Sequence, residues 1–347
     1  MQQYLVNTTG FALQELAQPN IYPVSPTAQW LSVHVPNEHD KVVLKTTLAA
    51  DIVRLSGLNI DELHLQDAAN PLHPSFYDGT PSYDMVVFRG LVTTNSDGNP
   101  ALLSDKKKYR LVPIHTEVTT FFVADHALIT VQHGNGPDIQ TMLPRIKTSA
   151  SPHELMLRFI NQQVDAYLAL RQPLTDVLDR WQRELLDPNL RFNDWVALLD
   201  ARLELRKLES LSEEQFEALG ELREAWTEPN ALPYSAEQVA TLRVRLSDVM
   251  EHIERVLNHA RRLELSVESA IQLHFASVSH QTNRTVTNLT LMTAVFAPLT
   301  LLTGFYGMNV PIPWQEHSNN VWWILAAMLL LEIGTLLVVL WLRRRRQ

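Results

Sequence analysis

Residues 305–309, Phe-Tyr-Gly-Met-Asn, place a polar asparagine between two long apolar segments near the C-terminus. The segments cover residues 286–305 and 321–342, and each meets the roughly 20 apolar residues needed to cross about 30 Å of hydrocarbon. Asn309 should therefore lie at the mouth of whatever the two segments enclose. Its carboxamide oxygen can accept hydrogen bonds from the bound waters of a hydrated cation such as Mg²⁺, which gives up those waters reluctantly.

The first apolar segment carries many hydroxyl and amide side chains. They are Thr287, Asn288, Thr290, Thr293, Thr300 and Thr303. A helix that faces only lipid needs no such groups, whereas a helix beside a wet pathway uses them. We therefore predict that residues 286–306 form a pore-lining transmembrane helix.

The second apolar segment, residues 321–342, has tryptophans at both ends and four arginines directly after it, at 343–346. Tryptophan rings favour the headgroup region, and arginines favour the cytoplasmic side. The loop over 307–320 contains no Lys or Arg. These features predict a multi-pass protein of the cell inner membrane with both termini cytoplasmic and an external loop, in which Glu316 could concentrate cations.

The charge and residue content exclude several classes of function. The chain has 38 acidic against 29 basic residues despite its basic tail, so the soluble part is acidic, which argues against nucleic acid and suits metal cations. The absence of cysteine excludes disulfides and thiolate metal sites. Phosphate-binding loops, Ser/His/Asp arrangements and HExxH motifs are also missing, so we expect neither an enzyme nor an organic cofactor. The first ten residues do not read as a signal peptide.

The N-terminal part alternates short β-rich runs with turn signals. The runs cover residues 30–35, 85–88, 109–112, 119–123 and 127–131. A cluster of Asn, Asp, Gly and Pro at 95–100 indicates a hairpin turn, and a helical pattern covers about 39–55. Residues 1–150 are therefore expected to form a cytoplasmic α/β domain with a mixed sheet, in a chain of the α+β class.

Residues 151–234 have a helical period and are predicted to form a helical hairpin region. Ser151, Pro152 and Glu154 combine an N-cap, a first-turn proline and a capping-box glutamate. Pro173 should interrupt this first helix. A second helix is expected from about 193 to 210, and Ser212 should open another.

The longest predicted element is a stalk helix over 235–285 that continues into the first span, because no proline occurs until Pro298. Apolar residues recur on it in steps of 3 and 4, a heptad seam that requires partner helices from the same chain or from other copies. The seam consists of Val239, Leu242, Leu246, Val249, Ile253, Val256, Ala260, Leu263, Val267 and Ala270.

The tetrapeptide Tyr-Gly-Met-Asn at 306–309, placed between two C-terminal spans, resembles the CorA family of divalent-cation transporters. The resemblance implies a homopentamer that moves magnesium, and also cobalt or nickel, with Gly307, Met308 and Asn309 at the ion entry. Ungapped matching through the first span implies a pore face of Asn283, Val286, Leu289, Thr293, Ala297 and Thr300. Val286 and Leu289 would form apolar rings that stop ions by dewetting.

The same resemblance implies a regulatory magnesium site between subunits. The stalk segment around Asp248 matches the family's aspartate-bearing segment, and Asp84, just before a predicted strand, would be its acidic partner. Many relatives have a second acid beside that partner, where this chain has Tyr83.

Several alternatives stay open at this point. The Gly-Met-Asn turn could be only a helix C-cap. Asp248, His252 and His259 share one helix face and could bind a transition metal, or they could be polar residues on a wet stalk. The chain could be a zinc transporter of the same superfamily, although it lacks the two glycines that this branch tends to have after the Asn. It could also be a membrane-anchored structural protein that conducts nothing.

Overall fold

The computed structural model describes residues 2–7, 10–11, 29–35, 53, 56–92, 113–133, 151–186, 195–229, 231–308 and 320–345. The chain divides into two compact units, Met1–Ile271 and Gln272–Gln347. The predicted strand at 109–112, the predicted turn at 95–100 and nearly all of the predicted helix at 39–55 lie outside the described residues.

The first unit contains a seven-stranded sheet in the order β2-β1-β3-β7-β6-β5-β4. The pair β3–β7 is parallel and the other neighbours are antiparallel, so the sheet is mixed, as predicted. The strands are β1 (Gln2–Asn7), β2 (Gly10–Phe11), β3 (Gln29–Val35), β4 (Phe76–Gly79), β5 (Asp84–Leu91), β6 (Thr116–Val123) and β7 (Ala127–His133). Four predicted strands match β3, β5, β6 and β7, whereas β1, β2 and β4 were not predicted.

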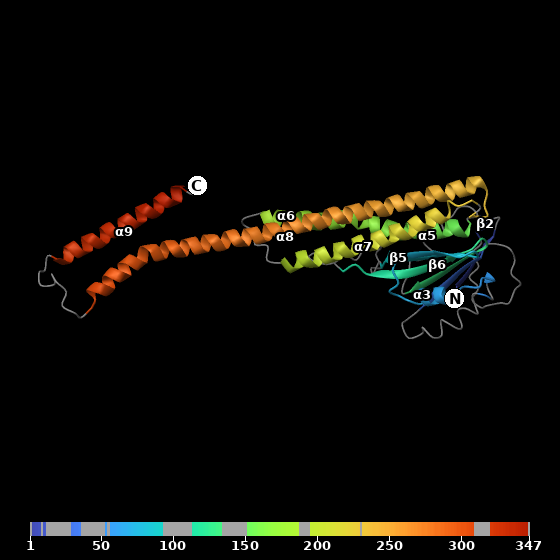
Figure 1. Ribbon diagram of the computed structural model, residues 1–347, viewed down its shortest axis with the longest axis horizontal. Helices are drawn as coiled ribbons and strands as arrows, with labels where there is room; N and C mark the ends of the chain where they lie inside the picture. Colours follow the sequence, from blue (N-terminus) through green and yellow to red (C-terminus); the bar gives the residue numbers. More distant parts are fainter. Residues whose placement is uncertain are drawn as a thin grey trace. The chain divides into compact units, whose positions relative to one another are not determined.

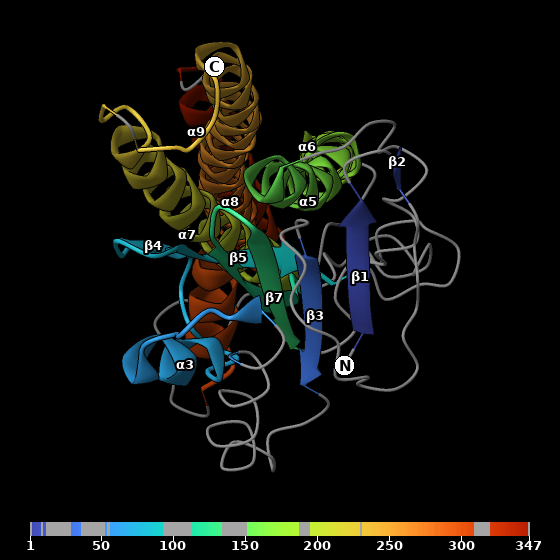
Figure 2. The ribbon, with the colours of Figure 1, turned by 90° about the vertical axis from the view of Figure 1, so that its right-hand side faces the viewer.

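Helices cover both faces of this sheet. Helices α5 (Pro152–Ala169) and α7 (Trp195–Ala225) lie against one face, and α3 (Glu62–Ala68) lies against the other (Figures 1 and 2). On the α5 face, the ring of Phe159 packs edge-on against Trp30 and Phe121. Because both faces are covered, every residue of β7 is buried, and buried and exposed side chains do not alternate along this strand.

Local signals set the boundaries of α5 and α6 (Arg171–Leu186). The Ser151 hydroxyl accepts a hydrogen bond from the backbone N–H of Glu154 at 3.2 Å, which confirms the predicted N-cap. The predicted interruption also occurs, at Leu170. Pro173 then lies in the first turn of α6, where its missing N–H has no helical partner to lose.

One predicted boundary is wrong. Helix α7 is continuous from Trp195 to Ala225, so Ser212 opens no new helix. Its side chain is fully buried, and its hydroxyl donates to the carbonyl of Leu208 at 2.8 Å. The hydroxyl is therefore satisfied inside α7, by the backbone one turn earlier, and does not serve as an N-cap.

The long helix α8 runs from Ala236 to Tyr306, as one element through the predicted stalk and first span. The Ser235 hydroxyl accepts from Gln238 N at 3.3 Å, and Gln238 Oε1 accepts from Ser235 N at 3.1 Å, a reciprocal capping box. Nine of the ten seam residues are buried in the chain's own core, against α5, α6, α7 and the sheet, and Val239 is partly buried. The chain's own elements therefore cover the seam.

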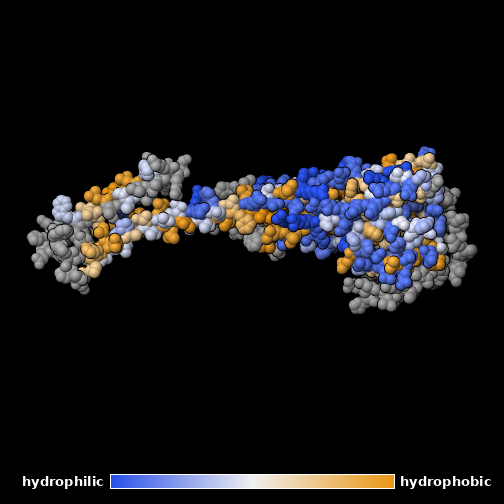
Figure 3. Space-filling view, viewed as in Figure 1, coloured by the Kyte–Doolittle hydropathy of each residue, from blue (hydrophilic) through white to orange (hydrophobic). Residues whose placement is uncertain are grey.

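The second unit contains the rest of α8 and helix α9 (Asn320–Arg345). Of the described helices, α8 alone is long and apolar enough to cross a membrane, with a mean hydropathy of 1.5 in its best window and none of that window buried. Helix α9 covers the predicted second span, and its described apolar stretch is Ala326–Thr335. Figure 3 shows the contrast between the hydrophilic surface of the first unit and the apolar and pale residues of the second.

Candidate cation pathway and regulatory site

The predicted pore face lies on α8 and is exposed along its length. Asn283, Val286, Leu289, Thr293, Ala297 and Thr300 are all exposed side chains. The apolar members Val286 and Leu289 are 54% and 64% exposed. Apolar side chains in such a row mark a surface that another molecule, lipid or protein, normally covers.

The threonines of this segment hold their hydroxyl protons in a fixed direction. Thr293 Oγ1 donates to the carbonyl of Leu289 at 3.0 Å, and Thr300 Oγ1 donates to the carbonyl of Phe296 at 2.8 Å. A hydroxyl has one proton and two lone pairs, so each oxygen keeps only acceptor capacity on its outer side. Metal-bound water is a hydrogen-bond donor, so these hydroxyls are suited to a hydrated cation.

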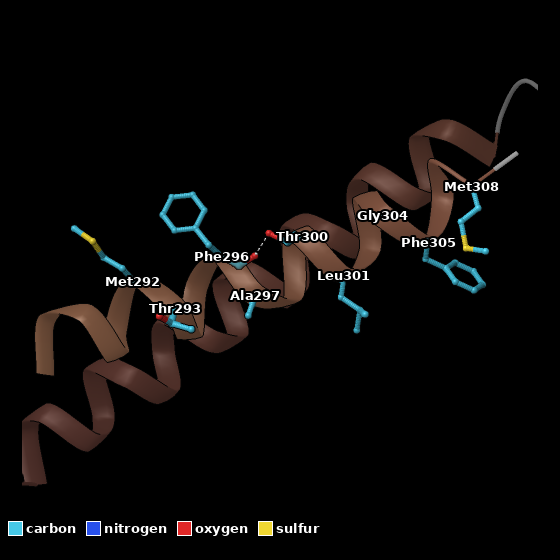
Figure 4. Close-up of a pocket in the computed structure, with 9 residues that line it drawn as sticks. All are labelled: Met292, Thr293, Phe296, Ala297, Thr300, Leu301, Gly304, Phe305 and Met308. Atoms are coloured by element: carbon cyan, nitrogen blue, oxygen red, sulfur yellow. Dashed lines mark hydrogen bonds between the residues drawn. The ribbon is translucent and has the colours of Figure 1, made fainter. Parts of the chain in front are cut away.

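An open groove of about 860 Å³ runs along the last turns of α8. Its lining side chains project from this helix, except that of Met308, which follows the end of the helix (Figure 4). The groove is lined by Met292, Thr293, Phe296, Ala297, Thr300, Leu301, Gly304, Phe305 and Met308. It includes Thr293, Ala297 and Thr300 of the predicted pore face. The sequence analysis did not select Gly304, although it follows Thr300 by one helical turn and so continues the same face.

The Gly-Met-Asn segment begins where α8 ends. Helix α8 stops at Tyr306, and the backbone N–H of Gly307 still donates to the carbonyl of Thr303 at 2.8 Å. A Cβ at position 307 would lie 3.0 Å from that carbonyl oxygen, so glycine relieves a tight contact there. Met308 is exposed. Asn309 and Glu316 lie outside the described residues, and their roles stay predictions.

Asp248 and the two stalk histidines do not share one metal site. Asp248 is exposed, with His252 Nε2 at 3.8 Å from Oδ1. His259 instead has its Nε2 3.1 Å from the carbonyl of Arg171 and 3.2 Å from the Thr175 hydroxyl, and burial lowers its pKa. Within the described part of the chain, no group of three or more His, Asp or Glu side chains is placed to hold a metal ion.

Asp84 begins β5, and both of its carboxylate oxygens are engaged within the chain. Oδ1 accepts from the Tyr77 hydroxyl at 2.9 Å, and Oδ2 accepts from Trp226 Nε1 at 3.0 Å. Burial raises the pKa of Asp84, although these two hydrogen bonds oppose the rise. Neighbouring Tyr83 is buried on the other face of the sheet, where its hydroxyl lies 2.8 Å from His64 Nδ1.

The comparison with protein families accounts for this combination of sheet domain, long helix and C-terminal turn. The family of CorA-like Mg²⁺ transporter proteins matches residues 29–345. The chain belongs to this family. A solved CorA magnesium transporter from Methanocaldococcus jannaschii superposes with a TM-score of 0.72 over 97% of each chain, at 15% identity. That likeness shows a CorA-like fold, as predicted.

Two relatives in sequence give further context for the CorA assignment. A Schizosaccharomyces pombe protein named as a candidate metal ion transporter is 30% identical over 105 residues, 28% of this chain and 17% of that protein. The cobalt/magnesium transport protein CorA of Thermotoga maritima is 27% identical over 157 residues, 45% of this chain and 42% of that protein. The chain thus spans less than half the length of either relative.

Proposed function

We propose that this CorA-family protein is a channel or transporter for divalent cations, with Mg²⁺ as its main cargo and Co²⁺ or Ni²⁺ as further cargo. One observation carries the proposal: on exposed α8, apolar Val286 and Leu289 lie on the predicted pore face, and the hydroxyls of Thr293 and Thr300 follow them on that face. An apolar constriction next to fixed acceptors fits an ion that moves with its water shell.

The assembly that uses this face is a homo-oligomer, with five copies as the family resemblance implies. Five α8 helices would surround the pathway, and α9 would lie with them in the lipid bilayer of the inner membrane. Both termini would be cytoplasmic and the loop after Met308 external. A ring of Asn309 side chains, with Glu316 nearby, would then meet the hydrated ion first.

Ion movement through this pathway needs no chemical step. The electrochemical gradient drives it, because each elementary charge gains about 2.3 kcal/mol per 100 mV of membrane potential. The threonine hydroxyls would accept hydrogen bonds from the ion's waters, and the rings of Val286 and Leu289 would close the path when they exclude water. Asp248, together with Asp84 of a neighbouring copy, would bind cytoplasmic Mg²⁺ and favour the closed arrangement.

Vesicles containing the purified full-length protein and an entrapped Mg²⁺ indicator test this function. With an inside-negative potential, external Mg²⁺ should enter these vesicles much faster than it enters protein-free vesicles. Competition with Zn²⁺ ranks the two ions, and stronger inhibition by Co²⁺ than by Zn²⁺ supports the magnesium branch. Uptake of Zn²⁺ in preference to Mg²⁺ would favour the zinc transporter, and no uptake of any ion would leave a non-conducting membrane protein.

A further inference from the structure

The carboxylate of Asp84 is covered by two aromatic donors from separate elements. The Tyr77 hydroxyl reaches it from β4, and the indole N–H of Trp226 reaches it from the end of α7. Trp226 is almost fully buried, and Tyr77 is partly buried. Each hydrogen bond occupies one lone pair of a carboxylate oxygen, so both donors compete with a cation for the charge of Asp84.

The residue opposite Asp84 on β4 is a glycine, which leaves room for the hydrogen bond between Tyr77 and Asp84. Gly79 pairs with Asp84 across β4 and β5. A Cβ at position 79 would lie 2.6 Å from the Tyr77 hydroxyl oxygen, so the Tyr77 side chain would have to shift. Glycine at this position therefore leaves the space in which the Tyr77 hydroxyl meets Asp84.

Trp226 is also hydrogen-bonded to the stalk helix α8. Its backbone carbonyl accepts a hydrogen bond from Arg243 Nε of α8 at 3.2 Å, and Arg243 Nη2 donates to the same oxygen. The guanidinium thus satisfies a free carbonyl beyond the end of α7, where positive charge is favourable. Asp84, Trp226 and Arg243 form a continuous connection from the sheet to α8, the helix that carries Asp248.

We propose that this connection is a latch that competes with cation binding: Trp226 and Tyr77 hold the Asp84 carboxylate, and a divalent cation binds it more tightly when either donor is released. Occupation of Asp84 by the cation would then replace a hydrogen bond of the connection between the sheet and α8. The proposal rests on the proposed function, because it concerns the regulatory cation. It adds two aromatic residues that set the cation concentration at which regulation occurs.

The test compares four variants of the full-length protein in detergent. Trp226→Phe and Tyr77→Phe each remove one donor and keep an aromatic ring. Asp84→Asn keeps an acceptor and removes the charge that attracts the cation. Trp181→Phe is the matched control, because Trp181 is another fully buried tryptophan whose Nε1 has no hydrogen-bond partner.

The measurement is the free Mg²⁺ concentration at which the stalk is protected from protease in half of the molecules. This concentration is called the midpoint. Loss of a hydrogen bond to a charged group should lower this midpoint about tenfold in Trp226→Phe and in Tyr77→Phe. Trp181→Phe should keep the wild-type midpoint, and Asp84→Asn should raise it. Two variants test the latch independently, so misfolding of Trp226→Phe, seen as aggregation on size exclusion, leaves Tyr77→Phe to decide.

Three results would each overturn the latch. The midpoint could be the same in wild type and in both donor variants. Asp84→Asn could leave the midpoint unchanged, or the wild type could show no protection by Mg²⁺. Vesicle uptake separates this failure from failure of the proposed function. If the wild type takes up Mg²⁺ but the midpoints of the two donor variants are not shifted, only the latch is contradicted. If the midpoints are shifted but the wild type takes up no Mg²⁺, only the transport function is contradicted.

Discussion

The imidazole of His153, in the first turn of α5, shares a hydrogen bond with the hydroxyl of Tyr234, with Nδ1 and the oxygen 2.9 Å apart. Tyr234 lies in the segment just before α8, so the bond joins the start of one helix to the start of another. His153 is 3% exposed, and its ring meets Trp226 and Tyr234 edge-on. A charged imidazole is disfavoured in this apolar site and beside the N-terminus of α5.

Burial lowers the pKa of His153 from 6.5 to about 4, which predicts a loss of stability in acid. Between about pH 6.5 and 4 the unfolded chain binds a proton at this histidine and the folded chain does not. The free energy of unfolding should therefore fall over this window, by on the order of 3 kcal/mol. Thermal unfolding of the full-length protein in detergent, from pH 4 to 7, should show a shallower acid slope in His153→Gln than in wild type. The exposed-turn variant His126→Gln is the control, and equal slopes for His153→Gln and wild type would contradict the prediction.

Asn309→Ala should strongly reduce Mg²⁺ uptake into vesicles while the oligomer stays intact. The change removes the acceptor ring proposed for the external mouth and takes away no packing side chain. Uptake rates and size-exclusion profiles measure the two effects separately. Asn258→Ala, which changes an exposed asparagine of α8 far from the predicted pore face, should transport at close to the wild-type rate. Normal uptake by Asn309→Ala would remove the selectivity ring from the mechanism.

Leu289→Ser should increase leak through the closed protein at high cytoplasmic-side Mg²⁺. A small hydroxyl in place of each leucine would wet the proposed apolar ring and remove the barrier that dewetting provides. The readout is Mg²⁺ flux at millimolar Mg²⁺ on the cytoplasmic face. Leu291→Ser makes the same chemical change outside the predicted pore face and should leak less. If both variants behave as wild type, Leu289 lines no gate.

Asp248→Ala should weaken the protection of the stalk by Mg²⁺. Asp248 is exposed on α8, and a neighbouring copy is expected to supply its acidic partner. Bound Mg²⁺ would relieve the repulsion between the two carboxylates and hold the copies together. Protease digestion with Mg²⁺ and with chelator should differ clearly in wild type and differ little in Asp248→Ala. Glu254→Ala removes an exposed acid of the same helix and should keep the wild-type difference; equal digestion of wild type under both conditions would argue against the sensor.

Local patterns in the sequence predicted the starts of α5 and α8 correctly. The caps at Ser151 and Ser235 involve groups three residues apart, so their hydrogen bonds follow from the order of residues. The buried seam of α8 in the first unit likewise follows from the 3.6-residue period. Ser212 shows the limit of such signals, because a serine followed by acids looks the same at a helix start and inside a helix. Its burial in the core decided between the two.

The sequence by itself determined the α+β class, the long helix, the position of the Gly-Met-Asn turn and the family, because each depends on composition or on short spacings. The tertiary structure decided which groups meet across long separations. It placed the seam of α8 against the chain's own helices and sheet, and it paired His259 with the carbonyl of Arg171. It also gave Asp84 its partner Trp226, 142 residues along the chain. Such contacts depend on how the sheet and helices pack together, and residue spacing along the chain carries little information about that packing.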